Sequence, residues 1–322
     1  MTDRPIVVIL GPRDEPPPGI ERAHEQAELR SAHGDIELRD VLPGADALFF
    51  WRASRRDLEA AWDAADRLRW IQTASDGVDG LLFPALIAAD TIVTNGRGIF
   101  DDAIAEWVIA ALLGFATRIP ESFAAQRQHR WISGETERLA GSKLLVVGPG
   151  PIGRAVATRA RALGMDVAAV GRTSRPDDHF GQIRAVAELT HAVAEADVVL
   201  DTLPLTPETR HLFNADVFAA MRPTARFVNV GRGATVDEQA LIRALQAGQL
   251  AGAALDVFET EPLAADSPLW DLPGVVISPH MCGDFQGWEN VAVELFLDNL
   301  RRFARGEDLR NRVDKHAGFG VG

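Results

Sequence analysis

Residues 143–164 read KLLVVGPGPIGRAVATRARALG, an apolar run of strand length, then a glycine-rich turn, then a helical pattern. Glycines at 148, 150 and 153 have the spacing G-x-G-x-x-G, which binds dinucleotides when a strand precedes it and a helix follows. The first permits a sharp turn, the second lets the backbone approach a pyrophosphate, and the third lets the helix pack closely on the strand. A purely structural turn is the alternative. The residues expected to contact the dinucleotide here are Gly148, Gly150, Pro151, Ile152 and Gly153.

The segment after the next predicted strand, 166–170, indicates which dinucleotide is bound. Such a strand usually ends in Asp or Glu, whose carboxylate holds the ribose 2′-hydroxyl. Here the chain continues GRTSR, and a guanidinium can pair with a 2′-phosphate through two hydrogen bonds. Asp177 and Asp178 come a few residues too late for the acidic role. We therefore predict a preference for NADP(H) over NAD(H), the alternative being a solvated basic loop with the ribose held elsewhere. The residues assigned to the phosphate are Arg172, Thr173, Ser174 and Arg175.

On both sides of this motif, short apolar runs alternate with helical patterns along the whole chain. This alternation predicts parallel sheets covered on both faces by helices. The strands predicted in the first hundred residues are 5–10, 35–40, 47–51, 69–73 and 91–95. A second series is predicted at 143–148, 166–170, 197–203, 225–230, 250–257 and 274–280. Six strands are the number of a complete doubly wound dinucleotide fold.

Two long helices, predicted at 101–117 and 287–306, mark the change from one series to the other. We predict an α/β protein with two doubly wound parallel sheets. A Rossmann-type dinucleotide domain at 101–287 would be inserted into a flavodoxin-like substrate domain made of 1–100 and 288–322. Helix 101–117 is apolar nearly all round, so we expect it to be buried.

The composition narrows the chemistry of this 322-residue chain. Its formal net charge of −13 argues against broad binding to nucleic acid or to anionic membranes. The absence of tyrosine excludes a Tyr-Lys proton donor, and the two lysines, Lys143 and Lys315, are poorly placed for a Schiff base. A single cysteine, Cys282, permits no internal disulfide and no cysteine-based metal cluster, and we expect no metal. With no leader pattern and no apolar run of spanning length, we expect a soluble, cytoplasmic protein.

Ligands of open α/β sheets lie beyond the carboxyl ends of the strands, and three predicted strands end in reactive side chains. Arg232 follows the strand at 225–230, and His280 ends the strand at 274–280. The strand between them, 250–257, has Asp256 near its end and is followed by Glu259 and Glu261. One cation, one carboxylate and one imidazole near a nicotinamide would form a site for ketone reduction. Arg232 would clamp a substrate carboxylate, His280 would donate the proton, and Glu261 would hold the imidazolium.

At these segments the chain resembles the D-isomer-specific 2-hydroxyacid dehydrogenase family, of the glyoxylate/hydroxypyruvate reductase kind. The matching segments are VVGPGPIGR, LPLTPETRHLF, FVNVGRGATVDE, AGAALDVFETEPL, SPLWDLPGVVISPH and LRRFARGEDLRNRVD. The resemblance implies a reversible reduction of a 2-oxoacid to an (R)-2-hydroxyacid, with Arg232, Glu261 and His280 as the catalytic residues. It also implies coenzyme contacts from other segments, at Leu203, Pro204, Thr206, Pro207, Val230, Gly231 and Asp256.

The resemblance extends to the first domain through IQTASDGVDGLL, whose backbone at Asp76 and Gly77 would meet the substrate carboxylate. Trp51, Arg52 and Trp288 are further candidates for the substrate site, with a surface role as the alternative for Arg52. Arg232 and His280 would contact substrate as well. Family members commonly pair through the helix that corresponds to 101–117, so a homodimer is expected. We expect Glu259 and the seven histidines other than His280 to be solvated, His129 having no motif behind it.

Three alternatives share this fold. A formate dehydrogenase would carry Gln where this chain has Glu261, and a phosphite oxidase would carry a lysine in the loop TASDGVDG, which has none. A nucleotide-sensing corepressor would keep the fold and even the catalytic residues without catalysis. A turnover assay separates that class from an enzyme.

Overall fold

The computed structural model describes residues 4–320, and its contacts divide the chain into two compact α/β units. The first unit is Met1–Phe100 with Phe285–Gly322, and the second is Asp101–Asp284. The second boundary lies at 284/285, three residues before the predicted boundary at 287/288. The fold class predicted from the sequence, two parallel sheets in an α/β protein, is confirmed.

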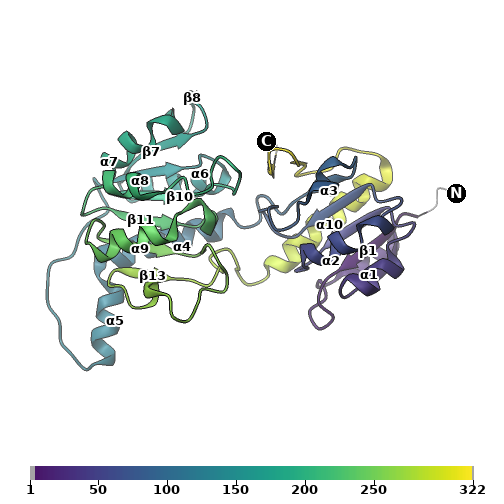
Figure 1. Cartoon of the computed structure of the whole chain (residues 1–322), viewed down its shortest axis with the longest axis horizontal. Helices are drawn as coiled ribbons and strands as arrows, with labels where there is room; N and C mark the ends of the chain where they lie inside the picture. Colours follow the sequence, from purple (N-terminus) through teal and green to yellow (C-terminus); the bar gives the residue numbers. More distant parts are fainter. Residues whose placement is uncertain (1–3, 321–322) are drawn as a thin grey trace. The chain divides into compact units, whose positions relative to one another are not determined.

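The first unit, in which β1 and α10 are labelled in Figure 1, contains a parallel five-stranded sheet. Its strand order is β2-β1-β3-β4-β5, which is the order of flavodoxin-like folds. Both faces are buried: Val8 and Leu10 contribute to one apolar cluster, while Val7 and Ile9 contribute to the other. Helix α10 covers the second face, and Phe296 of α10 stacks on Phe49 at 4.3 Å between ring centroids. The elements are β1 Ile6–Leu10, β2 Glu28–Ala32, α1 Asp35–Val41, β3 Ala47–Phe50, α2 Arg55–Ala60, β4 Trp70–Thr73, α3 Pro84–Ala88, β5 Ile92–Thr94, α10 Trp288–Arg305, β14 Val313–Asp314 and β15 Phe319–Gly320.

One strand of the first unit was predicted wrongly. Residues 35–40 form α1 rather than a strand, and the missing strand is β2, seven residues earlier in the chain. Ile36 and Leu38 alternate with charged residues, the pattern of a half-buried strand, yet Leu38 is buried whereas Ile36 is 77% exposed. Gly34, with φ of 113°, turns the chain between β2 and α1, and acids in the first turn favour the helix.

The second unit contains an eight-stranded sheet in the order β13-β12-β11-β10-β6-β7-β9-β8. Its parallel strands follow the Rossmann order with one more parallel strand, β13, beyond the sixth. Helix α4 packs against α6, and α5 with the loop that follows it extends away from the sheet (Figure 1). The elements are α4 Asp101–Thr117, α5 Ile119–Arg127, β6 Lys143–Val147, α6 Pro151–Ala162, β7 Asp166–Gly171, β8 Arg175–Asp177, β9 Gly181–Ala185, α7 Leu189–Ala194, β10 Val198–Asp201, α8 Ala215–Ala220, β11 Arg226–Asn229, α9 Glu238–Gln246, β12 Gly252–Leu255 and β13 Val275–Ile277.

The predicted count of six strands in this sheet was too low, because β8 and β9 were missed. They form an antiparallel hairpin, and β9 pairs in parallel with β7. In β9, GQIRA, the fully buried residue is Ile183, so this strand lacks the apolar run that marks its neighbours. Arg175 therefore lies in a strand rather than in a free loop.

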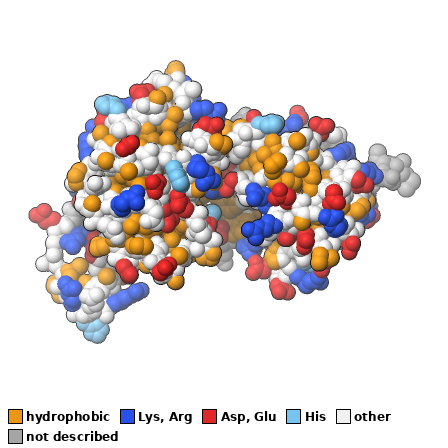
Figure 2. Space-filling view, viewed as in Figure 1, with side chains coloured by type: hydrophobic (Ala, Val, Ile, Leu, Met, Phe, Trp, Pro, Cys, Tyr) orange, Lys and Arg blue, Asp and Glu red, His pale blue; other side chains and the backbone are white. Residues whose placement is uncertain are grey.

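Helix α4 occupies the residues predicted for it, but it is not buried all round. Leu113 is 38% exposed, and Phe123 of the following helix is 61% exposed. The homodimer expected through this helix stays a prediction. Among residues 4–320, no single helix has the length and hydropathy of a membrane span, and only the pair α4 and α5, bent by 67°, passes that test together. Acidic and basic side chains are interspersed over the face seen in Figure 2.

Candidate active site

The glycine-rich turn joins β6 to α6 in the second unit. Gly148 has φ of 104°, in the left-handed region that favours glycine, and a Cβ at Gly153 would lie 2.5 Å from the carbonyl oxygen of Gly148. A Cβ at Gly150 would instead meet no atom within 4 Å. Open space therefore lies beside Gly150, where the first backbone N–H groups of α6 are available to an anion. This turn fits the pyrophosphate of a dinucleotide.

Arg172, Thr173 and Ser174 follow β7 as exposed residues at the start of the hairpin. The charge of Arg172 reaches Glu208 in the loop after β10: the pKa of Glu208 lies below its ordinary value, chiefly through a hydrogen bond from Thr206 and in part through Arg172. Arg172 is therefore close to the loop that holds the predicted coenzyme contacts at Leu203, Pro204, Thr206 and Pro207. That loop is ordered by Thr209, whose hydroxyl donates to the carbonyl of Pro204 at 2.7 Å.

The carboxylate of Asp177 is bonded to partners within the second unit. Arg154 of α6 donates to both of its carboxylate oxygens, at 3.0 and 2.5 Å. The backbone N–H groups of His179 and Phe180 also donate to it, at 2.9 and 3.0 Å. These bonds, with that from Arg154 foremost, lower the pKa of Asp177 far below its usual range. Neither Arg154 nor this anchoring role was predicted from the sequence.

The imidazole of His280 and the carboxylate of Glu261 form the central contact of the site. His280 Nδ1 lies 2.7 Å from Glu261 Oε2, and Glu261 Oε1 accepts from the backbone N–H of Phe258 at 3.0 Å. The His280 side chain keeps 48% of its surface exposed, and its Nε2 makes no hydrogen bond to the part of the chain that the structure describes. One nitrogen of the imidazole, Nδ1, is thus held by Glu261, and the other, Nε2, is available.

The electrostatics of this pair favour its charged form. The hydrogen bond to Glu261 raises the pKa of His280 above its ordinary value, although burial and the charge of Arg232 oppose the shift. Burial raises the pKa of Glu261, but the hydrogen bonds from His280 and Phe258 and the charge of Arg232 outweigh it, so that pKa is lowered. Arg232 acts electrostatically on both partners, so the structure brings the three predicted residues together.

Two neighbouring groups fix the loops that carry these side chains. Asp256, 1% exposed, accepts through Oδ1 from the backbone N–H groups of Met281 and Cys282 at 3.0 and 3.1 Å. Its carbonyl accepts from the N–H of His280 at 2.8 Å. Asp256 therefore positions the His280 loop, and the coenzyme contact expected of it stays a prediction. Burial, with the charge of Asp256, raises the pKa of the Cys282 thiol, which stays neutral.

The loop after β11 holds Arg232 in an ordered turn. The N–H of Gly231 donates to Asn229 Oδ1 at 2.9 Å, and Asn229 Nδ2 donates to the carbonyl of Arg232 at 3.1 Å. Val230 is buried, and a Cβ at Gly231 would lie 2.7 Å from the carbonyl oxygen of Leu203. The Arg232 loop and the loop after β10 are therefore in close contact.

Glu259 is exposed, as expected of a solvated neighbour, and it also has a partner of its own. Its carboxylate lies 2.6 Å from His211 Nε2, and its N–H donates to Glu238 Oε2 at 3.2 Å. Of the seven histidines other than His280, five are exposed, as expected, whereas His33 and His179 are partly buried. His33 Nδ1 lies 2.8 Å from the carbonyl of Gly11. Glu259 and His211 link the loops after β10 and β12, which a sequence pattern does not reveal.

The candidates in the first unit are placed as follows. Trp51 is 1% exposed and packs as a core residue, with Trp288 stacked on it at 5.7 Å. Arg52 lies over both indoles and pairs with Glu15 at 2.5 Å and Glu289 at 2.9 Å. Its charge is therefore already matched by two carboxylates.

The loop after β4 is internally bonded. The carbonyl of Asp76 accepts from Asn95 Nδ2 at 2.6 Å, and that of Gly77 accepts from the Ser75 hydroxyl at 2.9 Å. The assignment of these two residues to the substrate carboxylate stays a prediction.

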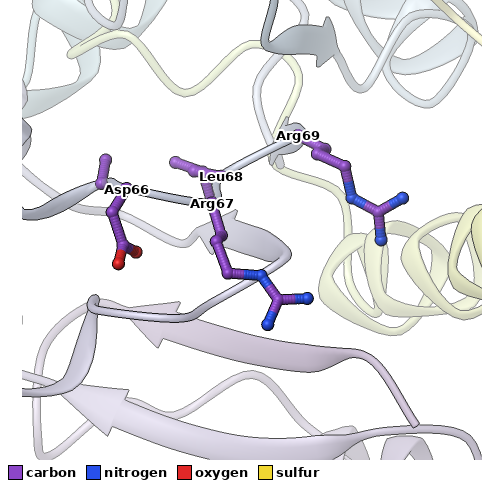
Figure 3. A pocket seen from close by; sticks show the side chains of 5 residues that line it. Asp66, Arg67, Leu68 and Arg69 are labelled. Carbon is purple, nitrogen blue, oxygen red and sulfur yellow. The ribbon is translucent and has the colours of Figure 1, made fainter. Parts of the chain in front are cut away.

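A pocket in the first unit lies at the opposite end of the strands from this loop. It is lined by residues 65–69, immediately before β4 (Figure 3). Arg67 and Arg69 both pair with Asp46, at 3.4 and 3.0 Å, so its charges are satisfied within the unit. Among residues 4–320, no group of three or more His, Cys, Asp or Glu side chains is arranged to hold a metal ion.

Comparison with known proteins connects this geometry to one family. The sequence pattern described as D-isomer specific 2-hydroxyacid dehydrogenase, NAD binding domain, matches residues 109–282. A glyoxylate reductase from Thermococcus kodakarensis is 33% identical over an alignment of 331 positions, which covers 97% of each chain. A D-3-phosphoglycerate dehydrogenase from Synechocystis is 32% identical over 301 residues, which span 90% of this chain and 52% of that longer protein. The crystal structure of a D-isomer specific 2-hydroxyacid dehydrogenase from Xanthobacter autotrophicus, in complex with NADPH and MES, is 30% identical, with a TM-score of 0.82 and coverage of 97% of this chain and 99% of that chain.

Proposed function

The chain belongs to the D-isomer-specific 2-hydroxyacid dehydrogenase family, and from that premise we propose that it reduces a small 2-oxoacid to the (R)-2-hydroxyacid. The observation that carries this proposal is the pairing of His280 with Glu261 at 2.7 Å under the charge of Arg232. These residues follow β11, β12 and β13, three neighbouring strands of one parallel sheet. A proton donor, its acidic partner and a fixed cation on adjacent strand ends suit reduction of a carbonyl that has a carboxylate beside it.

Three residues of the chain would have distinct roles in this reaction. The Arg232 guanidinium binds the substrate carboxylate and polarises the carbonyl, because its charge is permanent. His280 donates the Nε2 proton to the carbonyl oxygen, while Glu261 keeps the ring oriented through Nδ1 and stabilises the imidazolium. The reverse reaction uses the same atoms, with neutral His280 accepting the hydroxyl proton. The nicotinamide coenzyme, when bound, supplies or accepts the hydride.

We propose NADP(H) as the preferred coenzyme. The turn at 148–153 would hold the pyrophosphate, since the space beside Gly150 is open. Arg172, with the hydroxyls of Thr173 and Ser174, would hold the 2′-phosphate. The acid nearest in the chain, Asp177, is bonded to Arg154 through both oxygens, which leaves it unsuited to a ribose hydroxyl. The relative from X. autotrophicus was crystallised with NADPH, which supports the same choice.

Arg172→Ala is expected to lower kcat/KM for NADPH about tenfold or more and to leave that for NADH nearly unchanged. A hydrogen bond to a charged group contributes about 1.5–3 kcal/mol, and about 1.4 kcal/mol corresponds to a factor of ten. Steady-state kinetics with each coenzyme measure the ratio. Arg243→Ala, an exposed arginine near the far end of α9, is the control. An unchanged ratio in the Arg172 variant would contradict the phosphate assignment.

The proposed reaction is tested with a panel of 2-oxoacids, each assayed with NADPH and with NADH. We expect oxidation of NADPH with at least one small member such as glyoxylate, hydroxypyruvate or pyruvate, and the relative rates identify the side chain that the site accepts. Coenzyme binding without turnover of any member would contradict the proposal and favour a nucleotide-sensing protein of the same fold.

A further inference from the structure

A second acidic residue, outside the pair of Glu261 and His280, is buried beneath the Arg232 loop. Asp201 is the last residue of β10 and is fully buried. Its neighbours in register on the two flanking strands, Val147 of β6 and Asn229 of β11, are uncharged. Asp201 Oδ1 accepts a hydrogen bond from the N–H of Leu203 at 2.9 Å. A buried carboxylate without a cationic partner is costly, and it commonly takes up a proton instead.

The contacts of the other carboxyl oxygen require such a proton. The hydroxyl oxygen of Thr235 lies 2.5 Å from Asp201 Oδ2 and 2.6 Å from the carbonyl oxygen of Arg232. A hydroxyl has one proton, so it cannot donate to both oxygens at once. With ionised Asp201, one of these short contacts would join two acceptors. With protonated Asp201, the acid donates to Thr235 and Thr235 donates to Arg232, so both contacts are hydrogen bonds.

We propose that Asp201 is a positioning residue of the reductase, which carries a proton and holds the Arg232 loop through a relay from its carboxyl group to Thr235 and on to the Arg232 carbonyl. The same carboxyl group also holds the loop after β10, through the N–H of Leu203. The role assigned to Arg232 in this statement depends on the proposed function, whereas the protonation of Asp201 does not.

The surroundings of Asp201 agree with a neutral acid. Burial raises its pKa to about 7, and the hydrogen bonds from Thr235 and Leu203 only partly oppose the shift. Charged residues follow the neighbouring strands, among them Arg232 after β11 and Asp256 after β12, but among the described residues the shift in the pKa of Asp201 comes from burial and hydrogen bonds and not from a charged neighbour. The hydrogen bonds of the Asp201 side chain are instead those from Leu203 and Thr235. No cation therefore stabilises an ionised form among the described residues that bond to it.

The conservative variant Asp201→Asn separates this role from simple packing. An asparagine in the same orientation donates from its amide to Thr235 and accepts from Leu203, the pattern of the protonated acid, and it does not titrate. Ionisation of the wild-type residue would turn the Thr235 hydroxyl toward the carboxylate and remove its hydrogen bond to the Arg232 carbonyl. That carbonyl would then keep only the bonds from Asn229 Nδ2 and from the backbone N–H of Thr235. In the wild type, the hold on the Arg232 loop is therefore expected to weaken as pH rises through the pKa of Asp201. In Asp201→Asn, it is expected not to change over this pH range.

Infrared difference spectroscopy of the protein without coenzyme tests the protonation directly. The wild type minus Asp201→Asn is expected to show the carbonyl stretch of one protonated carboxylic acid at about pH 6, lost by about pH 8. If that variant does not fold, Thr235→Val replaces it: loss of the hydroxyl shifts the wild-type band, because the acid then has no acceptor for its proton. Absence of the band in the wild type at about pH 6 would overturn the proposal.

The positioning role is tested by kcat/KM for the 2-oxoacid at the same two pH values. With a pKa near 7, the protonated fraction falls about tenfold between about pH 6 and pH 8. The ratio of kcat/KM at the two pH values is therefore expected to be up to about tenfold larger for the wild type than for Asp201→Asn. The contribution of His280 is common to both proteins and cancels. Equal ratios would overturn the positioning role.

The two tests separate the relay from the proposed function. If the infrared band of protonated Asp201 is present but no oxoacid is turned over, the reductase proposal and the positioning role are both contradicted. The protonation of Asp201 would then still be established. If an oxoacid is turned over but the infrared band is absent, only the relay from Asp201 is overturned.

Discussion

His280→Ala lowers kcat for oxoacid reduction by about 10²–10⁴-fold, the usual contribution of a positioned general acid. The imidazole is held by Glu261 at 2.7 Å and has its second nitrogen available, so its removal deletes the proton donor and leaves the coenzyme turn intact. Turnover kinetics and a separate titration of NADPH binding measure the two effects. His191→Ala, an exposed histidine of α7 with a 77% exposed side chain, is the control. Near wild-type turnover in the His280 variant would contradict the assignment.

The same pair determines the pH dependence of the reduction. The pKa of His280 is raised, chiefly by the hydrogen bond to Glu261. The proton-donating form is therefore present below that pKa and is lost as pH rises through it. Glu261→Gln keeps an acceptor for Nδ1–H but removes the charge, so the fall in kcat moves to lower pH. A profile that does not move would show that Glu261 has no electrostatic effect on the proton donor.

Gly233→Ala is expected to lower kcat/KM by at least about 10²-fold, a loss that misplacement by about 1 Å can cause. A Cβ at Gly233 would lie 1.8 Å from the carbonyl carbon of Phe258 and 2.5 Å from the N of Glu259. These are backbone atoms and cannot rotate aside, so the loops that carry Arg232 and Glu261 must separate. Overpacking of this kind also destabilises the fold by about 1–3 kcal/mol. Kinetics and thermal unfolding measure both effects.

The matched control for this variant is Gly80→Ala. A Cβ at Gly80 meets no atom within 4 Å, and Gly80 is not among the glycines with positive φ. Its replacement is expected to change stability by less than about 1 kcal/mol. If Gly233→Ala kept wild-type kcat/KM and stability, the close approach of the two loops would not matter to the site.

The strongest local patterns predicted their elements well. The glycine motif at 148–153 begins directly after β6 and ends in the first turn of α6, as expected, and α4 begins and ends at the predicted residues. Both patterns are contained within one segment, so neighbouring residues suffice to specify them. The errors are at polar segments: 35–40 alternates like a strand but forms α1, and β9 contains few apolar residues but pairs with β7. There the packing against other segments decides, and local pattern does not.

The amino-acid sequence by itself determined the family, the α/β class and the strand ends that bear Arg232, Glu261 and His280, because these depend on apolar periodicity and on spacings within single segments. Only the tertiary structure decided which partner each of three other acids contacts. Asp177 is held by Arg154, and Glu259 by His211. Asp201 contacts the Thr235 hydroxyl, which also contacts the Arg232 carbonyl. Each of these three acids lies 23 or more positions from its partner along the chain, whereas the pairing of Glu261 with His280 was predicted from the sequence. Protonation follows from burial and bonding in space, which the order of residues along the chain does not specify.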